Sequence, residues 1–564
     1  MSPVGVSVAE AERLRELRGR TLWQLLSQTT ERDPEHEAIV AWDDDREESR
    51  VTYGEVLERA RALSAGLVAA GVRAGDRVAV QMTNRPEFIF SYFAIARIGA
   101  VAVPINTRFA AGEVAYVLRD SRARYLITLD RFRSVDFHGM LDTIVSSWRS
   151  SQAGALHDSG APELRTIVSL MRDGAGAELP AAALDLRALI GEDAGEEAIA
   201  LATRVEHEVR PDDLAMIKYT SGSTGFPKGA MLEHGGLIAD GLLHTERLEL
   251  DSSDRWFGNP PLFHVAGSIW GLMSCVTRGA TFVFGETFDP DVTLEMVQRE
   301  RCTVIFGVPT VLRDIISHAR QRDTDLSSVR LMGGGLDPSL AAAMREVIPS
   351  LTTTINGFGL TEAYGTSACP GPQDPPELQA TTCGRLYPGI EHRVVDHASG
   401  NEVAPGVTGE LWLRGLVTSG YWDDPENTAA VLDEDGWLHT GDLVSVDERR
   451  YLVYRGRIKT MLKIGGENVA VEEVERVILE HPKVQDGVVV GVPDERRDEV
   501  AYAYVLPEPD AIVEEQELVA WCSERLARFK VPERFVVVAE MPRIGSGKID
   551  RVAVARVATA GSAG

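Results

Sequence analysis

The chain has 564 residues, long enough to bury several hydrophobic cores, and its 44% hydrophobic and 25% charged residues are ordinary for a globular protein. Asp and Glu outnumber Lys and Arg by 85 to 58, which gives a formal net charge of −27. A chain this acidic is poorly suited to the phosphate backbone of a nucleic acid, so we expect no nucleic-acid partner. Any polyanionic ligand must therefore meet a local basic cluster.

The cysteines and the apolar segments indicate in which cellular compartment the protein resides. The five cysteines are widely spaced and form no CxxC pair, which argues against a disulfide framework or a cysteine-rich zinc site and favours a reducing cytoplasm. Residues 1–20 mix Glu and Arg without an apolar core, so they do not resemble a secretory signal. Phe88–Ile105 is the most membrane-like stretch, but Arg97 and Gly99 interrupt it. We interpret it as a buried helix followed by a strand, with no transmembrane segment.

Helix and strand signals alternate in the first part of the chain. Apolar residues recur at helical spacing over Val56–Leu67, and Gly71 is the expected C-terminal end of this helix. We expect a strand over Arg77–Met82, a helix that opens at Pro86, and a strand over Val101–Pro104. Such alternation is typical of an α/β layer with parallel strands.

Two later segments differ from this pattern. Gly174–Asp213 is rich in Ala, Gly and acids with little strand signal, so we expect a surface excursion there. After Arg457 the residues indicate a compact α+β unit. We therefore divide the chain into an N-terminal domain, 1–457, and a C-terminal mobile domain, 458–564. The elements expected in the C-terminal domain are a helix over Val471–Leu479, strands over Val488–Gly491 and Val500–Leu506, a helix over Glu515–Phe529, and a strand over Arg534–Ala539.

The strongest motif, YTSGSTGFPKG, occupies residues 219–229. An apolar strand leads into a loop of hydroxyls and glycines that ends in Lys228. Glycines let backbone N–H groups approach phosphate oxygens, hydroxyls add donors, and the lysine adds charge. The spacing is not that of a Walker loop, and a solvated turn is the alternative for such a loop taken alone. The candidate phosphate ligands are Thr220, Ser221, Gly222, Ser223, Thr224, Gly225 and Lys228.

Together with the motifs that follow, this loop resembles the adenylate-forming superfamily of acyl-CoA synthetases, peptide-synthetase adenylation domains and beetle luciferases. The resemblance extends from Tyr53 to Arg551 and is greatest to fatty-acid-type acyl-CoA synthetases. It implies a large α/β N-terminal domain of layered sheets and helices, joined by a hinge to a small α+β domain. It also implies an ATP-dependent acid–thiol ligase that forms acyl-CoA through acyl-AMP and releases pyrophosphate. ATP, Mg²⁺ and coenzyme A are its expected ligands.

The segment PLFHVAG, residues 261–267, matches the family's aromatic–His segment, whose histidine borders the acyl pocket. A satisfied core histidine is the alternative interpretation. An amino-acid-activating relative would need a carboxylate here to pair the substrate's ammonium group, and His264 carries no such charge. We therefore expect a non-amino acid. The expected lining of the acyl pocket is apolar and suits a fatty, alicyclic or aromatic acid. We expect its tryptophan to shorten the pocket. It comprises Val265, Ile269, Trp270, Val308 and Phe358.

Two further segments, LMGGGL and NGFGLTE, resemble those that line the adenine and the acyl pocket in the family. The glycines of the first would let main chain lie flat against a ring, and Phe358 offers a face for stacking. Thr361 can bond a phosphate oxygen. Glu362, with Thr224, is the expected ligand of Mg²⁺. The candidate nucleotide ligands in these two segments are Gly333, Gly334, Gly335, Gly357, Phe358, Gly359, Thr361 and Glu362.

The expected basic cluster lies at the domain boundary. Just before it, DGWLHTGD matches the family's ribose segment, and the carboxylate of Asp442 can accept both hydrogen bonds of a cis-diol. Four positive charges then fall within nine residues, although a solvated face is the alternative. By resemblance, Arg457 contacts ribose and phosphate, and Lys459 is the hinge. The segment that lines the thiol tunnel contains Lys463, Gly465, Gly466 and Glu467.

The segment PRIGSGKIDR, residues 542–551, supplies the family's catalytic lysine, Lys548. In the first half-reaction the carboxylate of the acid attacks the α-phosphorus of ATP, and Lys548 stabilises charge on the phosphoryl oxygens. In the second half-reaction the small domain swings about Lys459, and a thiol takes the acyl group. The catalytic candidates are Lys548, Glu362, His264 and Thr220.

Several alternatives remain open from the sequence. The acyl group could pass in trans to the phosphopantetheine of a carrier protein, or the chain could be a luciferase-like oxidoreductase that uses the same adenylate. A nucleotide-binding sensor without turnover is a different class, against which the intact Lys548, Glu362 and phosphate loop argue. The sequence contains no GxSxG elbow and no HExxH motif. It leaves the acid, the choice of CoA or carrier, and the oligomeric state open, with a homodimer among the options.

Overall fold

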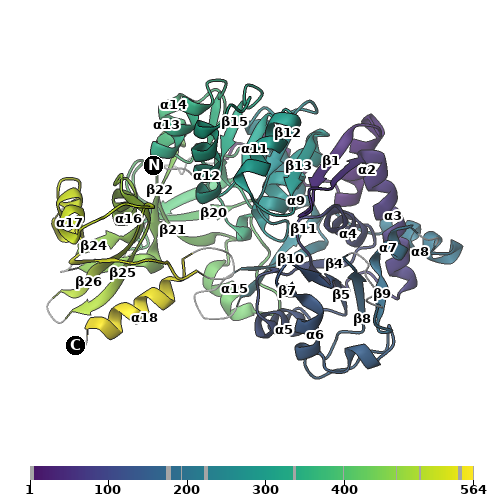
Figure 1. Cartoon of the computed structure of the whole chain (residues 1–564). Coiled ribbons are helices and arrows are strands. Elements are labelled where there is room, and N and C mark those ends of the chain that lie inside the picture. The colour runs from purple at the N-terminus through teal and green to yellow at the C-terminus, as the bar shows by residue number, and fades with distance from the viewer. Residues whose placement is uncertain are drawn as a thin grey trace. The chain divides into compact units, whose positions relative to one another are not determined.

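The computed structural model describes residues 6–172, 179–191, 194–220, 227–334, 338–397, 399–464, 467–494, 497–526, 528–543 and 549–562. The chain forms two compact units (Figure 1). The first comprises Met1–Glu391 and Leu413–Leu438, and the second comprises His392–Trp412 and His439–Gly564. The division into domains at Arg457 that the sequence suggests stays a prediction.

Two seven-stranded sheets organise the first unit. The first sheet contains β1 (Glu37–Trp42), β2 (Glu48–Thr52), β12 (Arg255–Gly258), β13 (Thr281–Gly285), β14 (Val304–Phe306), β15 (Leu331–Gly333) and β16 (Thr353–Ile355). The second contains β3 (Arg77–Gln81), β4 (Val101–Pro104), β5 (Tyr125–Leu129), β8 (Thr166–Leu170), β9 (Ala183–Asp185), β10 (Leu214–Thr220) and β11 (Lys228–Glu233).

Both sheets are parallel except at one edge strand each. The orders are β16-β15-β14-β12-β13-β1-β2 and β11-β10-β4-β3-β5-β8-β9. Strands β2 and β11 alone run antiparallel to their neighbours. The predicted α/β architecture with parallel strands is therefore confirmed, and β4 has the bounds that the sequence predicted.

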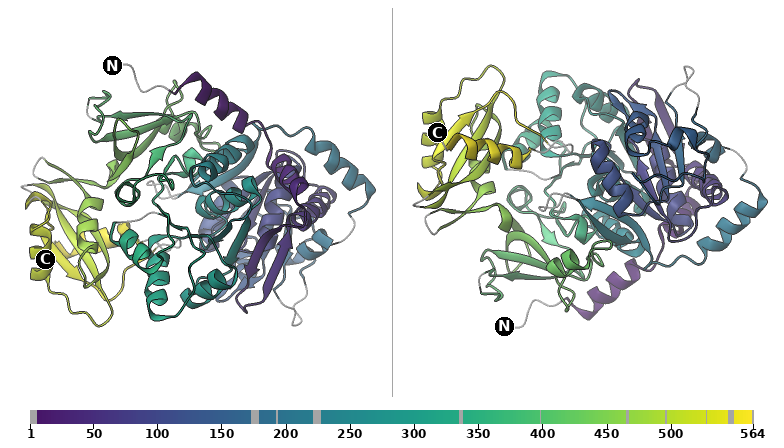
Figure 2. Two further views of the ribbon diagram at one scale, coloured as in Figure 1. Left: turned by 90° about the horizontal axis from the view of Figure 1, so that it is seen from above. Right: turned by 90° about the horizontal axis from the view of Figure 1, so that it is seen from below.

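Helices cover both sheets (Figure 1; two further views in Figure 2). One apolar cluster packs α11, α12 and α13 against the first sheet, and another packs α5 and α6 against the second. Between the sheets, α3 contacts β1 and β2, α4 contacts β3 and β4, and α9 contacts β10 and β11. These helices are α3 (Tyr53–Ala69), α4 (Pro86–Arg97), α5 (Ala111–Asp120), α6 (Phe137–Ile144), α9 (His234–Arg247), α11 (Pro290–Arg299), α12 (Pro309–Gln321) and α13 (Pro338–Val347).

Local sequence signals explain where several helices begin. Thr52 caps α3 by accepting from the backbone N–H of Glu55, whose side chain returns to the Thr52 backbone as a capping box. Pro86 stands in the first turn of α4, where its missing N–H has no cost. The other helices of this unit are α1 (Val8–Leu17), α2 (Leu22–Arg32), η1 (Trp148–Ser150), α7 (Leu186–Gly191), α8 (Glu196–Glu206), η2 (Ala266–Met273), α10 (Ser274–Arg278), η3 (Thr361–Ala363), α14 (Pro376–Thr381) and α15 (Pro425–Val431).

The surface excursion expected over Gly174–Asp213 is wrong for its described part. There β9 extends the second sheet, and α7 and α8 pack against α3. Alanine and glutamate are strong helix formers, and Ala202 of α8 is fully buried. At the end of α8, Glu206 forms an ion pair with the buried Arg97 at 2.5 Å. The acidic, alanine-rich composition therefore indicates an amphipathic helix rather than a loop.

The second unit contains a four-stranded and a five-stranded sheet. Helix α16 has the predicted bounds, whereas α17 ends at Ser523 and not at Phe529. Among the described residues, no helix is long and apolar enough to cross a bilayer. The elements are β19 (Glu391–Val395), β20 (Gly409–Arg414), β21 (Leu438–Val446), β22 (Leu452–Arg457), η4 (Ile458–Thr460), β23 (Met461–Ile464), β24 (Glu467–Ala470), α16 (Val471–Leu479), β25 (Val484–Asp494), β26 (Asp498–Pro507), α17 (Glu515–Ser523), β27 (Arg534–Val537) and α18 (Arg551–Ser562).

Candidate functional site

Several motifs follow parallel strands of the first sheet at the same edge. The His264 segment comes after β12, Gly334 comes after β15, and the Asn356–Glu362 loop comes after β16. Strands β12, β14, β15 and β16 are mutually parallel, so their carboxyl ends lie side by side. Ligands of open α/β sheets bind outside this edge. The fold therefore gathers the motifs that the sequence scatters over a hundred residues.

Two glycines at the end of β15 lie flat against neighbouring strands. Gly333 and Gly334 have φ angles of 156° and 147°. A Cβ on Gly333 would stand 2.1 Å from the carbonyl oxygen of Ile355, and one on Gly334 would stand 2.1 Å from that of Gly307. Only glycine fits both positions, which leaves bare main chain at the sheet edge. A flat ring such as adenine can approach a surface of this kind.

The loop after β16 is tied down by its own main chain. The Phe358 N–H donates to the carbonyl of Ala368 at 2.9 Å, and the Phe358 carbonyl accepts from the Ser367 N–H at 2.8 Å. Phe358 is 6% exposed, with Gly357 and Gly359 on either side, and Thr361 is 8% exposed. The ring is thus mostly covered in this conformation, and stacking on adenine stays a prediction.

Lys228 and Glu362 meet at one aromatic residue, Tyr421. The Tyr421 hydroxyl donates to Glu362 Oε1 at 2.7 Å, and Lys228 Nζ lies 5.5 Å from the Tyr421 ring centroid. Lys228 Nζ also donates to the side-chain oxygen of Asn427. In the β10–β11 pairing Lys228 stands opposite Thr220, so both flank the mouth of the hydroxyl-rich loop. One ring therefore spaces a cation from a carboxylate, an arrangement that can hold a polyphosphate with its metal ion.

The carboxylate of Glu362 fits a magnesium ion that is shared with a nucleotide. Among the described residues there is no group of three or more His, Cys, Asp or Glu side chains that could hold a metal. Mg²⁺ in phosphate-transfer sites needs only one or two protein carboxylates, because phosphates and waters complete its shell. Tyr421 fixes the orientation of Glu362 by the hydrogen bond just described.

His264 stands on an exposed turn, which the core-histidine alternative does not predict. Its Nδ1 accepts from the backbone N–H of Ala266 at 3.3 Å. Beneath this turn Lys218 Nζ donates to the carbonyl of Phe263 at 2.8 Å. Lys218 is 3% exposed, and burial lowers its pKa to about 7. Sequence patterns did not single out Lys218, although a lysine inside an apolar strand is an identifiable signal.

Lys218 leads to a prediction about stability and pH. Burial lowers its pKa in the folded protein from 10.5 to about 7, so the unfolded chain binds the proton more tightly. Unfolding free energy should therefore rise between pH 7 and roughly 10.5. Lys218→Met should remove this contribution, so that the gain in urea midpoint from pH 7 to pH 9 is smaller than in the wild type. Lys483→Met, at a half-exposed lysine, is the control, and an unchanged gain in Lys218→Met would contradict the prediction.

In the second unit, Asp442 and Arg457 face each other across the β21–β22 hairpin. Arg457 Nε donates to Asp442 Oδ1 at 2.7 Å, and the Asp442 backbone N–H donates to Thr440 Oγ1 at 3.1 Å. Asp442 is 3% exposed. An aspartate fixed by an arginine presents its second oxygen in a defined direction, as a ribose diol requires. The neighbouring Arg455 bonds Ser445 Oγ.

Several candidates lie outside the described residues: Ser221, Gly222, Ser223, Thr224, Gly225, Gly335, Gly465, Gly466 and Lys548. The main chain of Lys459 belongs to η4, and those of Lys463 and Glu467 belong to the paired strands β23 and β24. Their side chains also lie outside the described part, so the roles of all these residues stay predictions.

The expected acyl lining is mixed in its exposure. Ile269 is fully buried and Val308 is 47% exposed, whereas Trp270 is half-buried. The Trp270 ring stacks at a tilt on Phe306, with 5.2 Å between centroids, and its outer edge lies against Gly357. Trp270 therefore occupies space directly beside the loop that carries Glu362.

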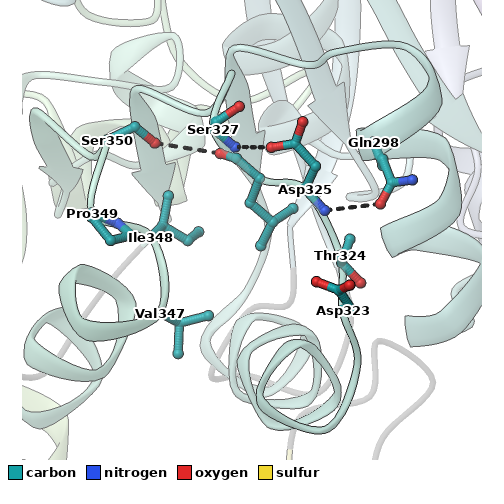
Figure 3. Close-up of a pocket in the computed structure, with 10 residues that line it drawn as sticks. Gln298, Asp323, Thr324, Asp325, Ser327, Val347, Ile348, Pro349 and Ser350 are labelled. Carbon is teal, nitrogen blue, oxygen red and sulfur yellow. Dashed lines mark hydrogen bonds between the residues drawn. The ribbon is translucent and has the colours of Figure 1, made fainter.

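A surface hollow elsewhere on the first unit contains none of the candidate residues (Figure 3). It is formed by loops that precede β15 and β16, so it lies at the amino edge of the sheet, opposite the motifs. Its polar groups bond one another: the Ser327 N–H donates to Asp325 at 2.9 Å, and Ser350 Oγ donates to the carbonyl of Leu326 at 3.3 Å. We assign no function to it.

Comparisons with known proteins agree over almost the whole chain. The AMP-binding enzyme family matches residues 26–422, and the AMP-binding enzyme C-terminal domain matches residues 473–548. The putative acyl-CoA synthetase YngI of Bacillus subtilis is 34% identical over 550 residues, covering 95% of this chain and 96% of that protein.

A second relative and a solved structure extend the comparison. A CoA ligase of Rhodococcus jostii is 35% identical to this chain, and the match covers 89% of this chain and 92% of that protein. That ligase is named for a propanoyl group on a 7a-methyl-1,5-dioxo-octahydro-1H-indene ring. The crystal structure of the anthranilate CoA ligase AuaEII with anthranoyl-AMP superposes with a TM-score of 0.81 at 26% identity, covering 97% of this chain and 98% of that one.

Proposed function

This chain belongs to the AMP-binding enzyme family and is an AMP-forming carboxylic acid–CoA ligase, and we propose that its substrate is a non-amino acid of the fatty, alicyclic or aromatic class. ATP supplies the adenylate, coenzyme A accepts the acyl group, and pyrophosphate and AMP are released. An acyl-AMP links the two half-reactions.

The observation that best supports this proposal is the meeting of Lys228 and Glu362 at Tyr421. One residue comes from the phosphate loop and the other from the loop after β16, and neither motif alone predicts their proximity. A cation and a carboxylate spaced by one aromatic ring suit an ATP polyphosphate with its magnesium ion. The exposed His264 turn lies at the same sheet edge and is available to border the acid.

In the adenylation step the protein mainly has to bring two anions together and to stabilise charge on the phosphoryl group. We assign Lys228, Thr220 and the loop that follows to the β- and γ-phosphates. Bound Mg²⁺ neutralises phosphate charge, and Glu362 with Thr224 would hold it. Lys548 stabilises the oxygens of the α-phosphoryl group during attack by the acid.

The nucleoside is assigned to main chain and to the hairpin of the second unit. Gly333, Gly334 and Gly335 would border the adenine, with Phe358 as its stacking partner. Asp442 would accept the ribose hydroxyls and Arg457 would contact ribose and phosphate. In the thiol step the small domain would turn about Lys459, which would bring the segment from Lys463 to Glu467 against the coenzyme A thiol.

The proposed class of acid depends on the charge at His264 and on the position of Trp270 beside Gly357. The position of His264 carries no carboxylate that could pair an ammonium group, which disfavours amino acids. Half-buried Trp270 beside Gly357 limits depth and favours a short or cyclic acid over a long fatty chain. The relatives named for a bicyclic dioxo acid and for anthranilate are consistent with this choice.

We also propose a cytoplasmic location for the enzyme and no nucleic-acid partner, and we leave a homodimer open. The reduced, widely spaced cysteines and the net charge of −27 support the first two. An acyl-AMP ligase that loads a carrier protein is the second candidate, and the same assay distinguishes it.

The test is pyrophosphate release over a panel of fatty, alicyclic, aromatic and amino acids, with and without coenzyme A and with mass detection of the thioester. Thioester formation from cyclic or short acids is the expected result. Pyrophosphate release without a thioester would indicate a carrier protein as acceptor. Preferential release of pyrophosphate with amino acids would overturn the proposed acid class. The absence of pyrophosphate release with every acid would favour a nucleotide sensor.

Trp270 allows a direct test of pocket depth. Replacing its indole by a methyl group in Trp270→Ala should open space beside Gly357, so we expect kcat/KM for long or bulky acids to rise roughly tenfold relative to short acids. The measurement is the ratio of kcat/KM values for a long and a short straight-chain acid. An unchanged ratio would show that Trp270 does not limit the pocket.

A further inference from the structure

A cluster of polar side-chain atoms is buried where α9 and β12 pack against η2, the helix that follows the His264 turn. Helix α9 contributes Asp240 and His244, one helical turn apart and both 0% exposed, and Trp256 and Trp270 face them from β12 and η2. Within the described part of the chain, one atom of each has no hydrogen-bond partner: Asp240 Oδ2, His244 Nε2, Trp256 Nε1 and Trp270 Nε1. Buried polar atoms are nearly always paired, so such atoms indicate a missing partner such as a ligand or water.

Two of these atoms converge on Gly365, three residues after Glu362. A Cβ on Gly365 would lie 2.9 Å from Trp270 Nε1 and 3.3 Å from Asp240 Oδ2. Gly365 has φ of 133° and follows Tyr364, which itself has a left-handed φ of 62°. Gly365 has no side chain that could cap either atom, so Trp270 Nε1 and Asp240 Oδ2 approach the same stretch of main chain with their hydrogen-bonding capacity unused.

The same indole reaches the proposed reaction site from its other edge. Trp270 Cη2 would lie 3.2 Å from a Cβ on Gly357, next to Phe358. The ring therefore spans from Gly357 to Gly365, the two ends of the loop that carries Thr361 and Glu362. A group that binds at Trp270 Nε1 and Asp240 would thus lie across one indole ring from Gly357.

Both converging atoms can act as donors. The indole N–H can only donate. Burial raises the pKa of Asp240 well above its ordinary value, and the described residues place no cation against it. Its Oδ1 accepts from the Thr366 N–H at 3.0 Å, so a proton on the carboxyl group leaves Oδ2 as a donor. Two neutral donors without a cation suit an uncharged acceptor oxygen, because an anion would lose too much hydration here.

We propose that Asp240 and Trp270 recognise an uncharged carbonyl or hydroxyl oxygen of the acid, remote from the carboxylate that reacts. This inference rests on the proposed function and narrows its substrate class to oxygenated cyclic acids. A site built to donate to such an oxygen rejects the analogue that lacks it, because its buried donors are then left unpaired.

The test compares cyclohexylpropanoate with its ring-ketone counterpart, oxocyclohexylpropanoate, by pyrophosphate release. The wild type should favour the ketone by roughly ten- to a hundredfold in kcat/KM. Trp270→Phe keeps a ring but removes the N–H, so the ratio should fall about tenfold. Asp240→Asn keeps a donor and an acceptor and should retain most of the preference. Trp148→Phe, in the separate core beside the second sheet, is the matched control and should keep the full ratio.

Equal use of the two acids by the wild type, or an unchanged ratio in Trp270→Phe, would overturn the proposal and assign the cluster to a buried water. Failure of the proposed function looks different, because no acid would then release pyrophosphate. In that case binding of oxocyclohexylpropanoate with AMP is measured by thermal shift. Stabilisation of the wild type but not of Trp270→Phe would support the site, and no stabilisation of either would overturn it.

Discussion

Lys548→Ala should form acyl-AMP about 10²–10³-fold more slowly than the wild type, the usual cost of losing one preorganised charge stabiliser. The same variant should make thioester from supplied acyl-AMP with a much smaller loss. The reason is that the developing phosphoryl charge exists only in the first half-reaction, and Lys548 is assigned to that charge alone.

The division between half-reactions is measured by single-turnover pyrophosphate release and, separately, by thioester formation from synthetic acyl-AMP. Lys463→Ala should show the reverse pattern, since its segment is assigned to the thiol path. Lys483→Ala is the control in the same unit, because its half-exposed ammonium pairs with Glu517 at 2.9 Å, apart from the motifs. Equal losses in both half-reactions for Lys548→Ala would refute the division of labour.

The sequence predicted those features that depend on neighbouring residues. Apolar spacing located Val101–Pro104 and Val471–Leu479 with the bounds that the structure has, and motif order indicated the fold and the chemistry. Helix length was predicted less well, since the helix expected to reach Phe529 ends at Ser523. Composition also misled over Gly174–Asp213, where alanine and glutamate form a packed helix.

The partners of the candidate residues could not be predicted in this way. Tyr421 and Asn427 orient Glu362 and Lys228 from a segment without a recognised motif. Lys218 supports the His264 turn from a strand that reads as ordinary core. These contacts depend on which loops meet at the sheet edge, and that follows from the strand order rather than from local spacing.

Glu362→Gln should lower the rate of pyrophosphate release about a hundredfold and raise the Mg²⁺ concentration needed for half-maximal rate. The amide has nearly the same shape and can still accept the hydrogen bond that Tyr421 donates at 2.7 Å. The change therefore removes the negative charge and leaves the geometry in place, and hard cations bind carboxylates better than amides.

Tyr421→Phe separates charge from orientation at the same carboxylate. It removes the hydroxyl that holds Glu362 but keeps the ring beside Lys228, so the hydrogen bond to Glu362 is lost. One such bond to a charged group is worth about 1.5–3 kcal/mol, an upper limit here because the freed carboxylate can still rotate to the metal. We expect a loss of roughly tenfold or less, with the Mg²⁺ requirement shifted less than in Glu362→Gln. If Glu362→Gln left the Mg²⁺ dependence unchanged, Glu362 would not be the metal ligand, and the tyrosine contact would be structural support for the loop after β16.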